Sequence, residues 1–124
     1  MLKIFRFKYG LLLLSLLCGC SQGSKVGEVY GKVTYQGQPV RFAKVEFKPV
    51  AGGKSSLGWT NEEGEYVAQY TLSENGALLG MHKVILNAYD QEGQPAPPVP
   101  AEYGGKAGVE FEVKPGSNQL DISF

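Results

Sequence analysis

The stretch Glu28-Val29-Tyr30-Gly31-Lys32-Val33-Thr34-Tyr35 decides the fold class of this chain. The residues Val29, Gly31 and Val33 alternate with larger or polar residues, and this period of two is typical of a β-strand that buries one face. A second run with the same period follows at Ala43-Lys44-Val45-Glu46-Phe47-Lys48. The residues Gln36-Gly37-Gln38-Pro39 between the two runs favour a turn. The sequence therefore predicts two strands joined by a turn.

The same alternation continues to the end of the chain. Apolar residues at strand spacing follow at Leu57, Trp59, Tyr66, Ala68, Tyr70, Val109, Phe111, Val113, Leu120, Ile122 and Phe124. In the middle of residues 82–89, Val84, Ile85 and Leu86 are consecutive apolar residues, so a strand there would be apolar on both of its faces. This pattern is expected of a central strand. No segment has a sustained 3.6-residue period, so we expect almost no helix. About seven short strands with turns between them predict an all-β sandwich.

Residues 90–108 differ from the rest because they are rich in proline and glycine. They predict a long connection with little regular structure, and such a connection in a small domain is usually functional or disordered. Shorter turns are predicted at Asn61-Glu62-Glu63-Gly64 and at Pro115-Gly116-Ser117-Asn118.

The N-terminal residues have the features of a bacterial lipoprotein signal. Lys3, Arg6 and Lys8 precede a leucine-rich run at 11–17, which is shorter than the roughly 20 apolar residues that a membrane span needs. Cys20 follows this run and resembles the acylated cysteine of such signals. We expect residues 1–19 to be removed, Cys20 to carry the lipid, and residues 20–27 to form a tether before a domain at 28–124. An ordinary secretory signal with a chance cysteine is the alternative.

The residue after Cys20 bears on localisation. In many well-studied bacteria an aspartate at this position keeps a lipoprotein in the inner membrane, but this chain has Ser21. By that resemblance we expect a lipid-anchored protein of the cell envelope, at the periplasmic or the surface face of the outer membrane. Because Cys18 leaves with the signal and Cys20 carries the lipid, no disulfide is expected in the mature chain.

Loss of the signal changes the charge of the protein. The whole chain has 12 basic and 12 acidic residues, and the removed segment holds three of the basic ones and none of the acidic ones. The mature chain therefore has a net charge near −3. This value argues against nucleic acid or an anionic membrane surface as a partner. About 105 residues remain, which is the size of one domain.

The order of the motifs resembles the carboxypeptidase regulatory-like domains found as small envelope lipoproteins. The matching segments are Gly31-Lys32-Val33, Gly37-Gln38-Pro39, residues 43–49, 60–66 and 79–80, Pro100-Ala101-Glu102-Tyr103, and residues 113–118. The resemblance implies a seven-stranded Greek-key β-sandwich of the transthyretin-like (prealbumin-like) type. It also implies an accessory or structural domain without an active site. His82 departs from the pattern, because these domains commonly have an aromatic residue there.

The candidate chemical groups give little support for catalysis. His82 is the single histidine, and no second histidine, cysteine or serine nucleophile stands beside it in the sequence. Gly52-Gly53-Lys54-Ser55 resembles the end of a phosphate-binding loop but lacks the earlier glycine, since position 48 is lysine. We expect no enzyme activity and no metal or other cofactor. The acidic turn at 61–65 leaves weak calcium binding open, although a plain hairpin turn is favoured.

Aromatic residues give the strongest alternative to a purely structural role. Tyr30, Trp59, Tyr66, Tyr70, Tyr89 and Tyr103 could form a platform for sugar rings, and related sandwich folds include starch-binding modules. We take Trp59, Tyr66, Tyr70 and Tyr103 as candidate ligand contacts, although the favoured interpretation places Trp59, Tyr66 and Tyr70 in the core.

The sequence as a whole predicts a non-enzymatic, lipid-anchored envelope protein that acts as a structural or protein-interaction module. The alternative is a carbohydrate-binding lipoprotein with an exposed aromatic platform. The expected partners are the membrane, through the lipid, and envelope proteins or glycans. An exposed row of aromatic residues would support the alternative, and a buried row would favour the structural role.

Overall fold

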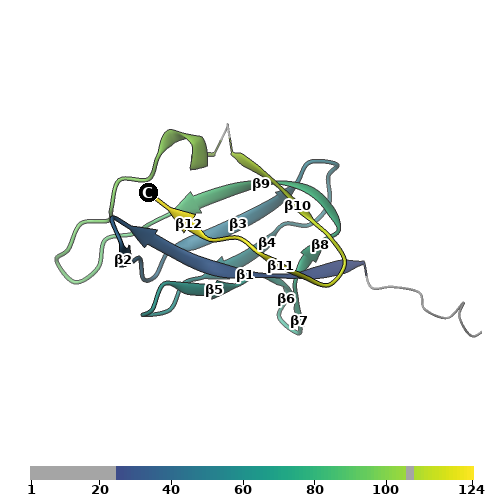
Figure 1. Ribbon diagram of the computed structural model, residues 1–124, viewed down its shortest axis with the longest axis horizontal. Helices are drawn as coiled ribbons and strands as arrows, with labels where there is room; N and C mark the ends of the chain where they lie inside the picture. Colours follow the sequence, from purple (N-terminus) through teal and green to yellow (C-terminus); the bar gives the residue numbers. More distant parts are fainter. Residues whose placement is uncertain (1–24, 106–107) are drawn as a thin grey trace, which may run out of the picture.

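Two β-sheets pack against each other to form a sandwich (Figure 1). The computed structural model describes residues 25–105 and 108–124, and these residues contain twelve strands and a short 3₁₀-helix, η2 (Ala101–Tyr103). Within these ranges no helix is long and apolar enough to cross a membrane. The predicted all-β sandwich is confirmed.

The first sheet is organised around its longest strand, β1 (Val26–Tyr35). On one side β1 pairs in parallel with β11 (Ser117–Gln119) and β12 (Ile122–Ser123). On the other side it pairs antiparallel with β2 (Gln38–Pro39), β5 (Glu65–Val67) and β8 (Ala77–Leu78). The C-terminal residues therefore complete the sheet that the first strand begins.

The second sheet is antiparallel throughout. Its order is β10 (Val109–Val113), β9 (Gly80–Asn87), β3 (Lys44–Pro49), β4 (Ser56–Trp59), β6 (Gln69–Thr71) and β7 (Glu74–Asn75). Strand β9 lies between β10 and β3, and Val84, Ile85 and Leu86 are all buried. The predicted central strand is confirmed.

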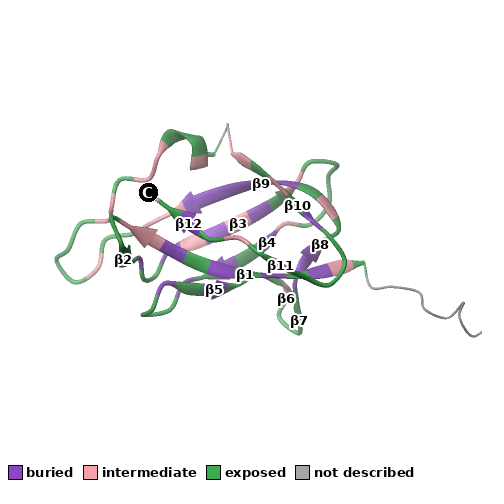
Figure 2. Cartoon of the chain, in the orientation of Figure 1, coloured by how far each residue is buried: buried purple, intermediate pink, exposed green. Residues whose placement is uncertain are grey.

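The core lies between the two sheets (Figure 2). Val29 and Val33 of β1 are fully buried, as are Val45 and Phe47 of β3, so the alternation of both strands is confirmed. The ring of Phe47 lies at the centre, with the rings of Tyr66, Phe111 and His82 at centroid distances of 6.2, 6.1 and 6.3 Å.

The structure has twelve strands in its described residues where about seven were expected, because the short strands β2, β7, β8 and β11 were not predicted and one predicted strand belongs to both sheets. Residues 65–67 form β5 in the first sheet, and residues 69–71 form β6 in the second. The chain changes sheets at Ala68, which is fully buried. Its amide donates to the carbonyl of Val29 at 2.9 Å, and its carbonyl accepts from the amide of Gly76 at 2.8 Å. Both backbone groups are therefore satisfied during the crossing.

Two predicted turns are shorter than expected. Gln36 and Gly37 alone turn the first hairpin, with φ of 52° and 82°, and residues 38–39 already form β2. Positive φ at both central residues is the requirement of a two-residue type I′ hairpin. At the other turn Ser117 already begins β11. There the side chain of Asn118 accepts from the Lys114 amide and donates to the Glu28 carbonyl, both at 2.9 Å.

The ends of the predicted segments also differ from the structure. Strand β1 begins at Val26, two residues before the predicted domain start, because Val26 and Gly27 pair with β8. Residues 1–19 and Cys20 lie outside the described residues. The connection at 90–108 contains an isolated bridge between Gln91 and Gln94 and the η2 turn, with residues 106–107 outside the described part.

Candidate functional site: an exposed aromatic patch

Trp59 is the last residue of β4, and its side chain is 50% exposed. Strand β4 pairs with β3 in the register Val45 to Gly58 and Lys44 to Trp59, so Gly58 shares the inner face with Val45. The favoured interpretation that Trp59 faces the core is therefore wrong. The physical reason is the ring of Tyr66, because a Cβ at position 58 would lie 2.8 Å from its Cδ2 atom. The inner face of β4 has to be small, and its large side chains project outward.

Trp59 is part of a cluster of three exposed rings, which we call the aromatic patch: Phe42, Trp59 and Tyr89. The rings of Trp59 and Tyr89 are stacked, with centroids 5.9 Å apart and an angle of 28° between their planes. The ring of Phe42 lies 5.8 Å from that of Trp59 at an angle of 49°. Phe42 and Tyr89 are 58% and 42% exposed. Three partly exposed aromatic rings thus lie together at the surface, at one end of the second sheet.

The backbone at Phe42 is in the left-handed region, with φ of 62°. A non-glycine residue in this conformation has an energetic cost of about 1–3 kcal/mol, and such residues cluster at functional sites. Thr60 holds the segment in place: its carbonyl accepts from the Phe42 amide at 3.2 Å, and its hydroxyl accepts from the Ala43 amide at 2.8 Å. Both Thr60 and Ala43 are buried, so the turn that presents Phe42 is anchored in the core.

Polar side chains surround the aromatic patch in three open clefts. One cleft, of about 450 Å³, has Tyr89 in its wall together with Tyr35, Arg41, Gln91 and Gln94. The next, of about 580 Å³, has Phe42 in its wall and the polar residues Arg41, Asn61, Glu62, Asp90, Gln91 and Glu92. The third, of about 440 Å³, has Trp59 in its wall together with Asn61, Glu65, Gln69 and Asn75. Each ring of the patch therefore borders a hollow that carries hydrogen-bonding groups.

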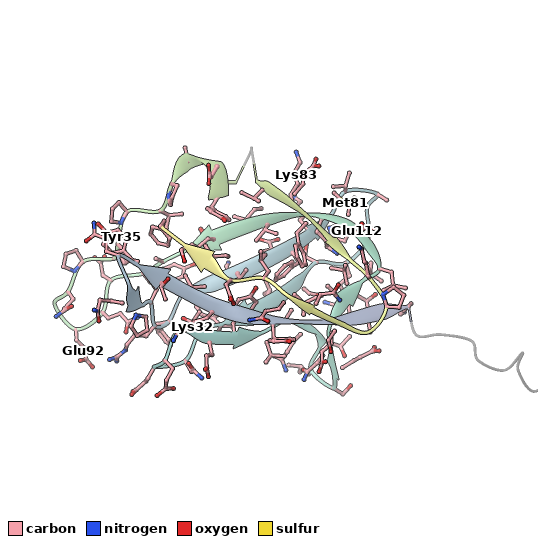
Figure 3. The ribbon with its side chains drawn as sticks, in the orientation of Figure 1. Lys32, Tyr35, Met81, Lys83, Glu92 and Glu112 are labelled. Atoms are coloured by element: carbon pink, nitrogen blue, oxygen red, sulfur yellow. The ribbon has the colours of Figure 1, made fainter. Side chains whose placement is uncertain are left out.

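One hydrogen bond links the two larger clefts. The side-chain amide of Gln91 donates to the carbonyl of Arg41 at 2.9 Å and joins the 90–97 connection to the segment before β3. Asp90 accepts from the amide of Ala96 at 2.8 Å within the same connection. Figure 3 shows Tyr35 and Glu92 together at this end of the molecule.

Tyr66, a predicted ligand contact, belongs to the core instead. It is buried, and its hydroxyl donates to the carbonyl of Leu120 at 2.7 Å. Burial, and next the nearby carboxylate of Asp121, raise the pKa of Tyr66 above its usual range. Here the favoured core interpretation agrees with the structure.

Tyr70 and Tyr103 are both half-buried and lie apart from the aromatic patch. The Nζ atoms of Lys25 and Lys54 lie 5.3 and 5.8 Å from the centroid of the Tyr70 ring. Tyr103 packs on the core from η2, and burial, followed by the nearby Glu102, raises its pKa. The four predicted aromatic residues thus do not form one platform, because only Trp59 belongs to the patch.

Phe42 was absent from the sequence prediction, and Tyr89 was only in the wider aromatic set. A signal for Phe42 existed in the alternation of β3. Since Ala43, Val45 and Phe47 face inward, residue 42 falls on the outward parity. What the sequence did not contain was the register that brings the end of β4 beside the ends of β3 and β9.

The acidic turn after Trp59 is closed by backbone hydrogen bonds. The side-chain oxygen of Asn61 accepts from the amides of Glu63 and Glu65, both at 2.9 Å, and Gly64 completes the turn with φ of 79°. This oxygen is occupied by amides, which favours a hairpin turn over a calcium ligand. In the described part of the chain, no group of three or more His, Cys, Asp or Glu residues is placed to hold a metal ion.

His82 is buried on the inner face of β9 beside Phe47. Its Nδ1 atom lies 3.0 Å from the carbonyl of Gly80, which requires a proton on Nδ1 and leaves Nε2 as an acceptor. Nε2 has no hydrogen-bond partner within residues 25–105 and 108–124. Burial lowers the pKa of His82, and the hydrogen bond to Gly80 opposes this effect in part. The burial favours a structural role over contact with a substrate.

No family model matches the chain, and no curated protein matches it either. A crystal structure of a DUF3823 family protein from Parabacteroides merdae is similar over 81% of this chain, with 12% sequence identity and a TM-score of 0.47. This chain spans less than half of that protein, 46% of its length.

Proposed function

We propose that this protein is a non-enzymatic, lipid-anchored binding module of the cell envelope. Cys20 carries the anchor, and the outer membrane is the proposed location. The order of its motifs supports membership of the carboxypeptidase regulatory-like group, with the Greek-key topology of transthyretin-like domains. The mature chain then needs no active site, and its function is binding.

The proposed ligand is carbohydrate, and the stacking of Trp59 on Tyr89 is the observation that carries this proposal. Two exposed rings at 5.9 Å and a third at 5.8 Å offer flat apolar faces to the C–H faces of sugar rings. The adjoining clefts supply amides, carboxylates and a guanidinium for sugar hydroxyls. An apolar surface with a few convergent polar groups is the usual form of a small-ligand site.

The position of the aromatic patch suits a tethered protein. Strand β1 begins beside the tether and crosses the domain (Figure 1), running through ten residues to Tyr35. Tyr35 borders the same cleft as Tyr89. At about 3.3 Å per residue the strand is about 33 Å long. A chain anchored before Lys25 would therefore hold the patch at the end of the domain that faces away from the membrane.

A structural or protein-interaction role is the second candidate, and the edge of the second sheet favours it. Strand β10 pairs with β9 on one side and ends the sheet on the other among the described strands. An edge strand offers unpaired backbone groups to a partner strand. The outward-facing Glu110 and Glu112 of β10 would limit such pairing to a partner that tolerates their charge.

A glycan array separates the two candidates. The mature chain with Cys20→Ser is applied beside the same chain carrying Trp59→Ala, and beside a Tyr30→Ala control that alters an exposed tyrosine of the other sheet. Binding that Trp59→Ala abolishes and Tyr30→Ala preserves supports the carbohydrate function. No binding across the array by a folded chain would reject it and leave the protein-interaction role.

A further inference from the structure

The end of the sandwich nearest the tether carries a second surface that the aromatic patch does not use. It consists of the apolar side chains Val50, Leu72, Leu79 and Met81 with the ammonium groups of Lys25 and Lys54, and we call it the tether-end surface. Leu72, at the tip between β6 and β7, is 98% exposed, and Val50 is 55% exposed. Isolated exposed apolar residues are common, but a group of them on adjacent loops marks an interaction site.

Backbone contacts place these loops side by side. The amide of Leu79 donates to the carbonyl of Lys25 at 3.1 Å, and the amide of Val50 donates to the carbonyl of Met81 at 2.9 Å. Lys25 and Lys54 both lie over the ring of Tyr70, which brings the 50–55 loop and the β6–β7 turn to the start of β1. Figure 3 shows Met81 and Glu112 at this end, opposite Tyr35 and Glu92.

The two ends of the molecule differ in charge. The tether end carries Lys25, Lys54 and Lys114 against Glu28, Glu74 and Glu112, so these charges balance. The segments at the aromatic end contribute Glu62, Glu63, Asp90 and Glu92, against Arg41. The net charge of the whole mature chain, near −3, argued against an anionic membrane surface, but it does not show this difference between the two ends. The aromatic end is therefore the more negative of the two, and at the tether end the ammonium groups of Lys25 and Lys54 beside Leu72 are the groups that attract anionic headgroups.

We propose that the tether-end surface docks on anionic phospholipid, with Leu72 entering the interface and Lys25 and Lys54 facing the headgroups. The inference rests on the proposed lipid anchor, because the anchor brings this end to the membrane. Cys20 is five residues before Lys25, so the linking chain spans at most about 18 Å. Within that reach the exposed leucine and the two lysines meet the lipid surface repeatedly, and a second membrane contact strengthens an acyl anchor.

Vesicle sedimentation of the unacylated chain tests this surface separately from the anchor. The mature chain with Cys20→Ser is mixed at low salt with vesicles of phosphatidylglycerol and phosphatidylethanolamine, or with vesicles of phosphatidylcholine alone. We expect at least about fivefold more protein to sediment with the anionic vesicles, and that difference to shrink at high salt. Failure of acylation in cells would reject the anchor and leave this result unchanged.

Matched variants assign the binding to the tether-end surface. Leu72→Ser and the double change Lys25→Glu with Lys54→Glu should each lower binding to anionic vesicles about fivefold or more. Leu57→Ser and Lys32→Glu, which alter exposed residues elsewhere, should leave it unchanged. Binding to neither vesicle, or equal losses in all four variants, would overturn the proposal. So would a change from dimer to monomer in Leu72→Ser without lipid, because the surface would then bind a second copy of the chain.

Discussion

Trp59 and Tyr89 stack although β3 lies between the strands that position them. Trp59 pairs across to Lys44, Lys44 pairs across to Asn87, and Tyr89 follows two residues after Asn87. Trp59 is therefore held by a paired strand, and Tyr89 stands two residues beyond the end of one. A platform held in this way loses little conformational entropy when a flat ligand binds to it.

A substitution at Gly58 tests why the side chain of Trp59 projects outward from the sandwich. Gly58→Ala would place a Cβ 2.8 Å from Cδ2 of Tyr66 and 3.1 Å from the carbonyl oxygen of Val67. We expect this overpacking to lower the free energy of unfolding by about 1–3 kcal/mol and the Tm by about 4 °C or more. Gly105→Ala is the control, because a Cβ at that position meets no atom within 4 Å. Equal stability of the two variants would reject this account of β4.

The left-handed backbone at Phe42 predicts which substitutions at this position preserve the free energy of unfolding. Asparagine tolerates a positive φ, whereas a β-branched residue does not. We expect Phe42→Asn to keep the free energy of unfolding within about 1 kcal/mol of the wild type, and Phe42→Val to lower it by about 1–3 kcal/mol. Urea denaturation measures both. A Phe42→Val variant as stable as Phe42→Asn would mean that the backbone relaxes at this position.

His82 predicts a loss of stability in mild acid. Its pKa in the folded chain is lowered by burial, so the folded protein binds a proton less readily than the unfolded chain does. The full stability is therefore present above pH about 6.5, the ordinary histidine pKa, and it decreases as the pH falls below that value toward the lowered pKa. The slope from this one group is at most about 1.4 kcal/mol per pH unit.

Denaturation between pH 5 and 7 checks the His82 prediction. His82→Phe keeps a ring beside Phe47 and removes the titrating group, so its stability should be nearly flat over the same range. A wild-type curve that is just as flat would show that the buried imidazole accepts a proton without penalty.

The lipid anchor predicts a simple chemical difference in cells. The full-length chain, expressed in a bacterium with a lipoprotein pathway, should appear in the membrane fraction and incorporate labelled palmitate. Cys20→Ser should remove the label and release the mature chain from the membrane fraction, whereas Cys18→Ser should keep the label. Membrane-bound, unlabelled protein would contradict the assignment of Cys20.

Much of the fold was predictable because one face of each long strand is buried. The alternation at Val29 and Val33, and again at Val45 and Phe47, follows directly from the pleat of a strand. The crossing at Ala68 was not predictable, since Tyr66, Ala68 and Tyr70 keep the same parity while the chain moves from one sheet to the other. The alternation of inward-facing and outward-facing residues along a strand is the same whichever sheet the strand joins.

The candidate site was less predictable than the fold because it depends on register. Leu57 and Trp59 have the spacing of inward residues, yet Gly58 is the residue opposite Val45. Two apolar residues on alternate positions indicate a strand but do not indicate which face is the core. The ring of Tyr66 decides that question, and its contact with Gly58 joins two different sheets.

Fluorescence titration tests the carbohydrate proposal most directly, because Trp59 is the only tryptophan in the chain. Its emission reports on the aromatic patch alone. Oligosaccharides that bind there should produce a saturable change in emission, which Tyr89→Ala removes and Tyr30→Ala retains. A chain that stays folded and shows no saturable change with any oligosaccharide, including those retained on an array, would contradict the proposal.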